Sequence, residues 1–417
     1  MYGILIFLTL NKHNRHEDFN YHSEIWADKA GYYVYLPATF KYGFDASKFP
    51  KSIDSNTGNG FLLNTETNTV QTKYTYGVSL MQLPFFLIAE ISSVLTDQPS
   101  DGFSPINHLV INFAAISYFL LGLILLFHVL RNTYNNRVGI WVLASVFLGT
   151  NLYYYVVSAT GMSHVYSFFL FSWFLYLLQK TNFLTQKTTK KNLFVFGLVS
   201  GLIILTRPSN IIFLVSFLFV FAQNMDTVKD RIKTILNPII LLPILVGVAV
   251  IFIPQFIYWK FAFGTWLRYS YQDEGFNWLS PYFLSVWFSP NNGLFLYGSL
   301  YLLVVAALFY SAFQNMVNWF YLVMFFGVSY ITASWWIWDF GCSYGSRNFV
   351  EYLALFAIPL GSFYLYIGNK SNLAKAGIFI IGLAMVVLNF ILVYAFDDCY
   401  FGEGNWDWNF YFNLITG

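Results

Sequence analysis

Charged side chains are scarce in this sequence, and their scarcity argues against a soluble protein. Asp, Glu, Lys and Arg make up only 10% of the 417 residues, whereas a soluble domain carries about 25%. Hydrophobic residues reach 57% and aromatic residues 22%, so the chain lacks the polar surface that a water-facing globule of this length needs. The composition predicts an all-α polytopic membrane protein.

Cysteine, excess charge and glycine-rich loops are also lacking. The 22 basic residues exceed the 20 acidic residues by only two, which provides no basic surface for nucleic acid. The only cysteines, Cys342 and Cys399, exclude a zinc cluster of thiolates or a disulfide-rich scaffold. The histidines show no metal-ligand spacing, and no glycine-rich phosphate loop is present. We therefore predict neither a metal centre nor a nucleotide site.

Apolar segments suited to crossing a bilayer recur along the whole chain. A spanning helix needs about 20 apolar residues, and the sequence offers about eleven candidate segments. The expected spans are Met1–Leu10, Ile106–Leu130, Val138–Tyr154, His164–Gln179, Leu193–Leu205, Asn210–Gln223, Pro238–Phe261, Gly293–Phe313, Trp319–Trp336, Phe349–Ile367 and Ala376–Phe396. The first is too short alone, which indicates a late start codon or a trimmed N-terminus. Residues 1–417 are expected to form a single integral membrane domain.

The distribution of charge predicts the orientation of these spans. Loops rich in Lys and Arg alternate along the chain and all fall on one face, as cytoplasmic loops do. Acidic residues collect on the opposite face, so we expect a cytoplasmic N-terminus and an external C-terminus. Both cysteines are then external, where a Cys342–Cys399 disulfide is feasible and two unpaired thiols are an equal alternative.

Two external loops, residues 11–104 and 264–292, are too long to be simple connectors, because loops beyond about 15 residues tend to be functional. Within the first, Tyr76–Leu95 is apolar but carries Gln82, Pro84 and Glu90. We expect this segment to form a helix that lies in the membrane interface, because a further span here would invert every downstream loop.

An acidic pair stands near the start of the first external loop. Glu24 and Asp28 are four residues apart and share one face if the stretch is helical. A carboxylate at the membrane surface can accept a proton from the hydroxyl of an acceptor molecule. Glycosyl transfer by direct displacement requires such a base. Solvated loop acids without such a role are the more common case at this spacing.

Basic residues occupy several external helix ends. Lys73 precedes the interfacial helix, where an ammonium suits a lipid phosphate, although a snorkelling anchor is more common. Arg347 opens the tenth span and Arg207 lies at an external turn, so both suit an anion or serve as interfacial anchors. His164 begins the fourth span and suits acid–base work or headgroup binding, with a structural histidine as the default.

The order of these motifs resembles the GT-C superfamily of integral membrane glycosyltransferases, in the branch of protein O-mannosyltransferases and aminoarabinose transferases. Asp28–Pro37 is similar to a D-x-x-x-Y-Y-x-Y-L-P stretch, and Lys73-Tyr74 resembles a lysine-led segment that meets the carrier phosphate. Ser289–Phe295 is similar to S-P-x-x-G-L-F, and Tyr344–Arg347 to Y-G-x-R. The chain departs from the pattern at Asn291-Asn292, where basic residues are expected. It also departs at the first acidic motif, where Glu24 and Asp28 are four residues apart and not adjacent as in some relatives.

The resemblance implies an inverting glycosyltransferase that moves a sugar from a polyprenyl phosphate to a hydroxyl of a glycan, protein or lipid acceptor. Asp28 is the implied base, with Glu24 as its alternative. The implied donor site consists of Lys73, Tyr74, Arg347, Arg207 and His164, and the implied substrate lining of Tyr32, Tyr33, Tyr344 and Trp287. This route needs no cofactor or metal, and it implies a bacterial inner-membrane protein whose site faces the periplasm or exterior.

Other functions remain open at this point. The alternatives are a flippase or transporter for lipid-linked glycans and a non-catalytic envelope scaffold. Transporters usually carry polar or charged residues at mid-span and often have repeated halves. Here the ionisable residues gather at the external rim and no repeat is apparent, which favours a site at the membrane surface. The aromatic residues of the second external loop, Trp287 among them, also fit an interfacial belt.

Overall fold

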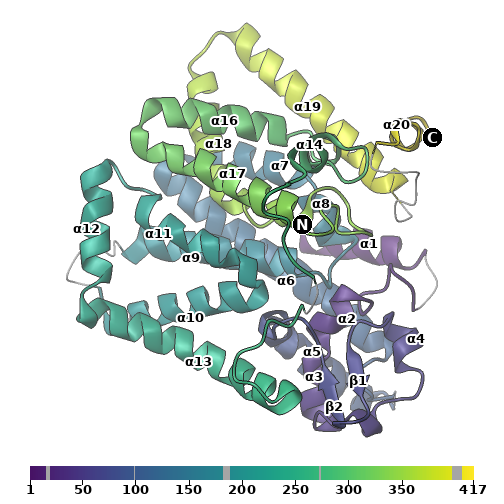
Figure 1. The fold of residues 1–417 in the computed structure, drawn as a ribbon. Helices are drawn as coiled ribbons and strands as arrows, with labels where there is room; N and C mark the ends of the chain where they lie inside the picture. The colour runs from purple at the N-terminus through teal and green to yellow at the C-terminus, as the bar shows by residue number, and fades with distance from the viewer. Residues whose placement is uncertain (16–18, 98, 182–187, 272–273, 397–405) are drawn as a thin grey trace.

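Long, tilted helices stacked side by side make up most of the structure, a computed structural model (Figure 1). It describes residues 1–15, 19–97, 99–181, 188–271, 274–396 and 406–417. The main helices are α1 (Tyr2–His13), α6 (Pro105–Thr133), α7 (Asn136–Leu148), α9 (Ser163–Thr181), α10 (Lys190–Thr206), α13 (Pro238–Phe263), α16 (Tyr301–Gln314), α17 (Trp319–Ser334), α18 (Leu353–Gly368) and α19 (Asn372–Ala395). The prediction of an all-α membrane fold is confirmed.

Five helices are long and apolar enough to cross a membrane by length and composition. They are Gly77–Leu95, Pro105–Thr133, Pro238–Phe263, Met316–Ser334 and Asn372–Ala395. Four shorter apolar helical segments are Asn136–Leu148, Pro208–Phe219, Tyr301–Gln314 and Leu353–Gly368. The larger number of about eleven spans stays a prediction, because it includes segments shorter than the usual bilayer thickness.

Two expected spans are not continuous helices, which corrects the sequence analysis. Residues 138–154 are divided at Gly149 into α7 and the short α8 (Leu152–Val157). Residues 293–313 are likewise divided into α15 (Leu294–Tyr297) and α16. The first break is stabilised from α19, where Asn389 Nδ2 donates to the carbonyls of Leu148 and Thr150 at 2.8 and 3.1 Å. A buried break needs such a partner, because the lost helical bonds have no water to replace them.

The segment expected as the span Asn210–Gln223 is also not a regular α-helix. It forms the 3₁₀ helix η3 (Pro208–Val215) followed by a single turn, α11 (Ser216–Phe219). The neighbouring helix α12 (Met225–Ile235) supplies Arg231, whose guanidinium donates to the carbonyls of Phe217, Leu218 and Val220 at 2.6–3.1 Å. This arginine satisfies carbonyl groups that would otherwise end the segment without partners.

The first external loop folds into a compact layer of short elements. They are α2 (Asp28–Tyr33), α3 (Tyr35–Pro37), the π-helix η1 (Ala38–Tyr42), the 3₁₀ helix η2 (Ala46–Lys48), α4 (Ile53–Thr57) and the antiparallel hairpin of β1 (Leu62–Asn64) and β2 (Thr69–Gln71). A second cluster of buried side chains, including Ile25, Tyr33, Val34 and Trp259, joins this layer to the end of α13. Figure 1 shows α2, α4 and the hairpin at the opposite end of the molecule from α12.

The segment expected as an interfacial helix forms α5 (Gly77–Leu95), which packs along α6 and touches the end of α10. A Cβ atom on Gly77 would lie 2.4 Å from the backbone carbon of Leu205, so only glycine permits this approach. Its placement in the interface stays a prediction, since its length and composition also suit a span.

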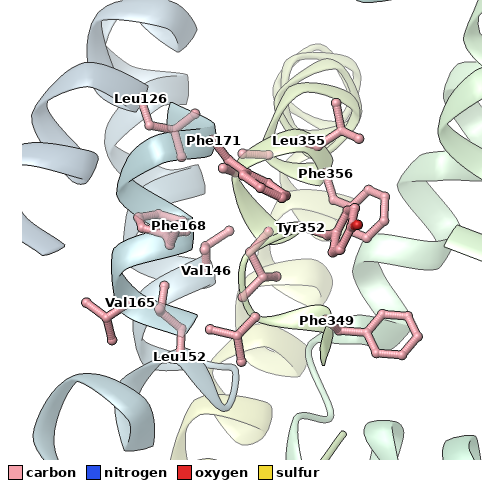
Figure 2. Packing of buried hydrophobic residues seen from close by; sticks show 14 of the residues in the cluster. Leu126, Val146, Leu152, Val165, Phe168, Phe171, Phe349, Tyr352, Leu355 and Phe356 are labelled. Carbon is pink, nitrogen blue, oxygen red and sulfur yellow. The ribbon is translucent and has the colours of Figure 1, made fainter. Parts of the chain in front are cut away.

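The main core lies where α6, α7, α9 and α18 meet. Its fully buried side chains include Leu126, Val146, Leu152, Val165, Phe168, Phe171, Phe349, Leu355 and Phe356. Figure 2 shows the side chains of α9 and α18 facing each other across this core. Close packing of this kind fixes the first turn of α18 and the loop before it, which carries the 3₁₀ helix η5 (Arg347–Phe349).

Candidate active site

Asp28 is the first residue of α2, and its carboxylate is held by two distant parts of the chain. Oδ1 accepts a hydrogen bond from the Tyr74 hydroxyl, and Oδ2 accepts one from Nη2 of Arg347 at 2.9 Å. Ala27, just before the helix, has a φ of 46°, which turns the chain sharply into α2. About a third of the Asp28 side chain remains exposed, at 32%, so a further group can approach its oxygens.

The electrostatic surroundings of Asp28 keep it ionised. Burial raises the pKa of Asp28, but the charge of Arg347, the Tyr74 hydrogen bond and the charge of Lys73 lower it further, so the net pKa lies below its usual value. Burial and the neighbouring Asp28 charge raise the pKa of Tyr74 well above its usual value. Tyr74 therefore remains a phenol that donates to the carboxylate.

Lys73 extends from the segment just before α5 to a carboxylate on the second external loop. Its Nζ lies 2.6 Å from Oε1 of Glu274. The ammonium also lies 5.5 and 5.7 Å from the ring centres of Tyr271 and Tyr74, within the range of a cation–π interaction. The second external loop thus contributes both an anion and an aromatic ring to the surroundings of Lys73.

Arg207 follows the end of α10 and belongs to a buried polar cluster. Its Nη1 lies 3.2 Å from Oε1 of Glu351 and 2.9 Å from Nδ1 of His164, and its Nη2 donates to Oδ1 of Asn348. Glu351 Oε2 lies 2.8 Å from His164 Nδ1, and the Glu351 side chain is 1% exposed. The carboxylate of Glu351 therefore fixes both the guanidinium and the imidazole.

These groups surround a common region next to Tyr32. The Tyr32 ring packs on Tyr74 with centroids 4.2 Å apart, and its hydroxyl accepts a hydrogen bond from Ser163. Burial raises the pKa of Tyr32, and the charges of Arg207, Asp28 and Arg347 all act on it. The structure thus brings together five segments of the chain that carry Asp28, Lys73-Tyr74, Arg207, Glu274 and Arg347.

Among the described residues, three ion pairs of this region balance their charges. Three cations each pair with a different carboxylate: Lys73 with Glu274, Arg207 with Glu351, and Arg347 with Asp28. Partly buried charged side chains need partners of opposite charge, because an uncompensated charge away from water is strongly unfavourable.

Glu24 does not share a helix face with Asp28, contrary to the expectation from their spacing. The helix begins only at Asp28, and Glu24 points into a separate cavity of about 420 Å³ between the end of α1 and the start of α6. There it accepts from Asn112 Nδ2 at 2.6 Å and lies 3.2 and 3.1 Å from Nδ1 of His13 and His108. Burial raises its pKa, but the His108 hydrogen bond and the two imidazoles lower it to about 2.

Lys29 follows Asp28 directly in the chain, and the charges of Glu24 and Asp28 both act on it. Its Nζ donates to the carbonyl of Tyr21 at 3.0 Å, and the side chain is buried. Burial lowers the pKa of Lys29 to about 8, against the opposing effects of Glu24 and Asp28. Glu24 and Lys29 together form a structural support behind the turn that presents Asp28.

Three residues expected to line the substrate lie in packed surroundings instead. The Tyr33 hydroxyl donates to the carbonyl of Gly102 at 2.7 Å, and its ring packs on Phe86 and Phe103. Tyr344 stacks on Tyr154 with centroids 4.5 Å apart. Trp287, on α14 (Phe283–Phe288), donates from Nε1 to Oγ of Ser329 at 3.0 Å. Tyr32 is the one of the four whose hydroxyl the charges of Asp28, Arg207 and Arg347 reach.

Asn291 and Asn292, which stand where basic residues were expected, position the loop before Arg347. Asn291 Nδ2 donates to Oδ2 of Asp339 at 2.7 Å, and Asn292 Nδ2 donates to the carbonyls of Asp339 and Gly341. Gly345 N–H in turn donates to Asn292 Oδ1 at 3.2 Å. The asparagines therefore act on the loop that carries Arg347.

Sequence reasoning missed the counter-ions Glu274 and Glu351. Glu351 follows Arg347 by four residues, a spacing that places both at one helix entrance. Glu274 lies in the long loop already expected to be functional. Neither signal identified a partner, because the partners Lys73 and Arg207 are far away in sequence.

Among the residues that the structure describes, no group of three His, Cys, Asp or Glu side chains is arranged to hold a metal ion. Cys399 lies outside the described residues, so the Cys342–Cys399 disulfide stays a prediction.

Comparison with known proteins identifies the fold but no close relative. No family of known proteins and no curated protein matches the sequence. Among solved structures, the archaeal oligosaccharyltransferase AglB from Archaeoglobus fulgidus, in complex with an inhibitory peptide and a dolichol-phosphate, is 14% identical with a TM-score of 0.52. The oligosaccharyltransferase of the same organism in the apo form is 12% identical with the same TM-score. Each match covers 94% of this chain and 55% of the other, so the chain spans about half the length of these structures. The likeness shows that this protein shares the fold of these oligosaccharyltransferase structures.

Proposed function

We propose that this protein is an inverting glycosyltransferase that moves a sugar from a polyprenyl phosphate to an acceptor hydroxyl at the external membrane face. The observation that carries the proposal is an ionised, partly exposed carboxylate, Asp28, placed among three cations outside the long helices. Lys73 and Arg347 act on Asp28 directly, and Arg207 reaches the same region beside Tyr32. The shared fold supports it, since AglB was solved with a dolichol-phosphate.

The proposed reaction is a single displacement. Asp28 takes the proton of the acceptor hydroxyl, whose oxygen attacks the anomeric carbon as the bond from that carbon to the phosphate oxygen breaks. The electron pair of the broken bond stays on the phosphate, so the lipid leaves as a phosphate monoester. One negative charge therefore disappears at Asp28 as one appears on the phosphate, and the total charge of the site is unchanged.

The Asp28–Arg347 pair couples these two events. A general base works best when its pKa is near the working pH, and in the donor-free site Arg347 keeps the pKa of Asp28 low. A donor phosphate that binds Arg347 draws this cation away from Asp28, which raises the pKa of Asp28 at the moment when a base is needed. Protonation of Asp28 then leaves Arg347 to stabilise the departing phosphate.

Replacing Asp28 by Asn tests the proposal. Asn keeps the shape and the Tyr74 contact of Asp28 but cannot hold the proton, so we expect transfer to fall at least about 100-fold. Mass spectrometry of lipids retained by the gently purified variant measures donor binding, and we expect a polyprenyl-phosphate sugar to remain. The mass of the retained lipid also gives the mass of the sugar.

Asp54→Asn is the matched control, because Asp54 is an exposed acid on α4 of the same loop. It should transfer sugar at the wild-type rate. Full activity of Asp28→Asn would remove the proposed mechanism. Bulk phospholipid alone in every purified variant would shift the evidence toward a transporter or scaffold.

A further inference from the structure

The Lys73–Glu274 pair differs from the two other ion pairs of the candidate active site in its exposure. The side chains of Lys73 and Glu274 are 35% and 28% exposed, so water reaches both partners. Arg207 and Glu351 are 14% and 1% exposed. In the third pair Asp28 is more open, but Arg347 is only 14% exposed. Lys73 is therefore the cation that an incoming anion reaches most easily.

The chemistry of the two partners also favours exchange. An ammonium is a compact charge with three rotatable donors, whereas a guanidinium binds its partner through a fixed fork. Lys73 can thus replace one oxyanion by another without a change of its own position. The rings of Tyr271 and Tyr74, whose centres lie 5.5 and 5.7 Å from the ammonium, provide cation–π contacts that do not involve the Glu274 carboxylate.

The backbone delivers the Glu274 carboxylate to this position independently of Lys73. Glu274 N–H donates to the carbonyl of Tyr271 at 2.9 Å, and the Tyr269 hydroxyl donates to the Glu274 carbonyl at 2.7 Å. The following residue is also fixed, because Trp336 N–H donates to the Gly275 carbonyl at 3.0 Å. The carboxylate can therefore rotate away from Lys73 while the backbone of Glu274 and Gly275 keeps its hydrogen bonds.

We infer that the Glu274 carboxylate occupies the subsite of the carrier phosphate in the donor-free protein and competes with that phosphate for Lys73. The inference rests on the proposed function and adds to it a residue that sets donor affinity. Because each of the three described ion pairs is neutral, a phosphate that binds one of their cations displaces the carboxylate of that pair. Glu274 is that carboxylate, and it holds the place of the lipid phosphate until the lipid arrives.

Glu274→Gln therefore strengthens binding of the carrier. The amide keeps the size of the side chain but removes the competing charge, and a partly exposed ion pair corresponds to a factor of about three to five in affinity. The experiment measures the dissociation constant of purified full-length protein for a polyprenyl phosphate in detergent micelles. The matching polyprenol, which has the same tail and no phosphate, should bind equally to wild type and variant.

Two further variants separate competition from a structural effect. Glu66→Gln removes the same charge from an exposed position on the first external loop, which also carries Lys73, and should leave affinity unchanged. Lys73→Ala should weaken binding of the phosphate, and adding Glu274→Gln to it should bring no gain, because the competed cation is gone. A gain that persists without Lys73 would assign the effect to the general field of the site and overturn the inference.

The outcomes also distinguish this inference from the proposed function. Unchanged or weaker phosphate binding in a folded Glu274→Gln protein, together with a loss in Lys73→Ala, would overturn the competition but leave the carrier site in place. Equal binding of polyprenol and polyprenyl phosphate by the wild type would overturn both. A gain seen with inorganic phosphate but not with the lipid would mark a free-anion site and would also refute the assignment.

Discussion

At the scale of single residues, the candidate active site is defined by its ion pairs. Asp28, Lys73, Arg207 and Arg347 could be selected from the sequence, because charges are rare in this chain and these stand near external helix ends. The pairing of these residues could not be predicted, nor could the partners Glu274 and Glu351, because the ion pairs join residues up to 319 positions apart. The separate environments of Glu24 and Asp28 were likewise hidden, since the turn at Ala27 breaks the helical spacing on which their grouping depended.

Glu24 should stabilise the fold rather than perform the chemistry. Its pKa is about 2 in the folded protein against an ordinary value of 4.5. The ionised group is therefore stabilising above pH 4.5, and this contribution is lost as the pH falls toward 2. At about 1.4 kcal/mol per pKa unit, the full contribution is about 3 kcal/mol.

Glu24→Gln should accordingly lower the thermal unfolding midpoint at pH 7 and remove much of its decline between pH 4.5 and 2. Differential scanning fluorimetry in detergent across that range measures the effect, with Glu66→Gln as the exposed control. Sugar transfer at permissive temperature should persist. A well-folded Glu24→Gln protein with no transfer would instead make Glu24 the base.

At the scale of elements, α10 and α13 cross closely at two glycines, Gly197 and Gly247. A Cβ atom on Gly197 would lie 2.1 Å from the Ile244 carbonyl oxygen, and one on Gly247 would lie 2.4 Å from the Phe194 oxygen. Small residues allow such backbone approach between helices in lipid, where van der Waals contact supplies much of the attraction. Because α10 ends just before Arg207, this crossing also sets the position of that cation.

Gly197→Val should force α10 and α13 apart. We expect a loss of about 1–3 kcal/mol of stability from overpacking, seen as a lower unfolding midpoint, with weaker carrier binding because Arg207 shifts. Gly382→Val on α19 is the matched control, since a Cβ atom there meets nothing within 4 Å. Equal midpoints for the two variants would contradict a tight crossing.

The hydropathy of the sequence predicted where most helices lie, but it did not predict where a helix is broken. Apolar runs identified most of the long helices, because burial in lipid is a property of each segment by itself. The breaks in residues 138–154 and 293–313 depend on partners elsewhere in the fold, as Asn389 shows at the first break. A window of sequence holds no information about such a distant donor.

At the scale of the whole molecule, the two ends of the helix stack carry different structures. One end carries α12, with Lys229, Arg231 and Lys233, and the other carries the layer of α2–α4 and the hairpin (Figure 1). The active-site segments all approach the second end. The sequence-based topology places this end outside the cell, in agreement with the excess of basic residues at the first.

Cysteine labelling in intact cells tests this orientation. In a chain with Cys342 and Cys399 changed to Ser, a cysteine at Asn59 should react with a membrane-impermeant thiol reagent. A cysteine at Lys370, between α18 and α19, should react only after the membrane is opened. The reverse labelling pattern would show the opposite membrane orientation, with the candidate active site on the cytoplasmic side.

The assembly of the site from five distant segments has a consequence for biosynthesis. The ribosome delivers the chain from the N-terminus, so Asp28 and Tyr74 leave the translation machinery long before Arg347 and Glu351. Through most of synthesis Asp28 is a carboxylate without its guanidinium, and Arg207 is a guanidinium without its carboxylate. A nascent chain interrupted before Arg347 therefore exposes Asp28 and Arg207 without their ion-pair partners, so the site can form only when synthesis is nearly complete.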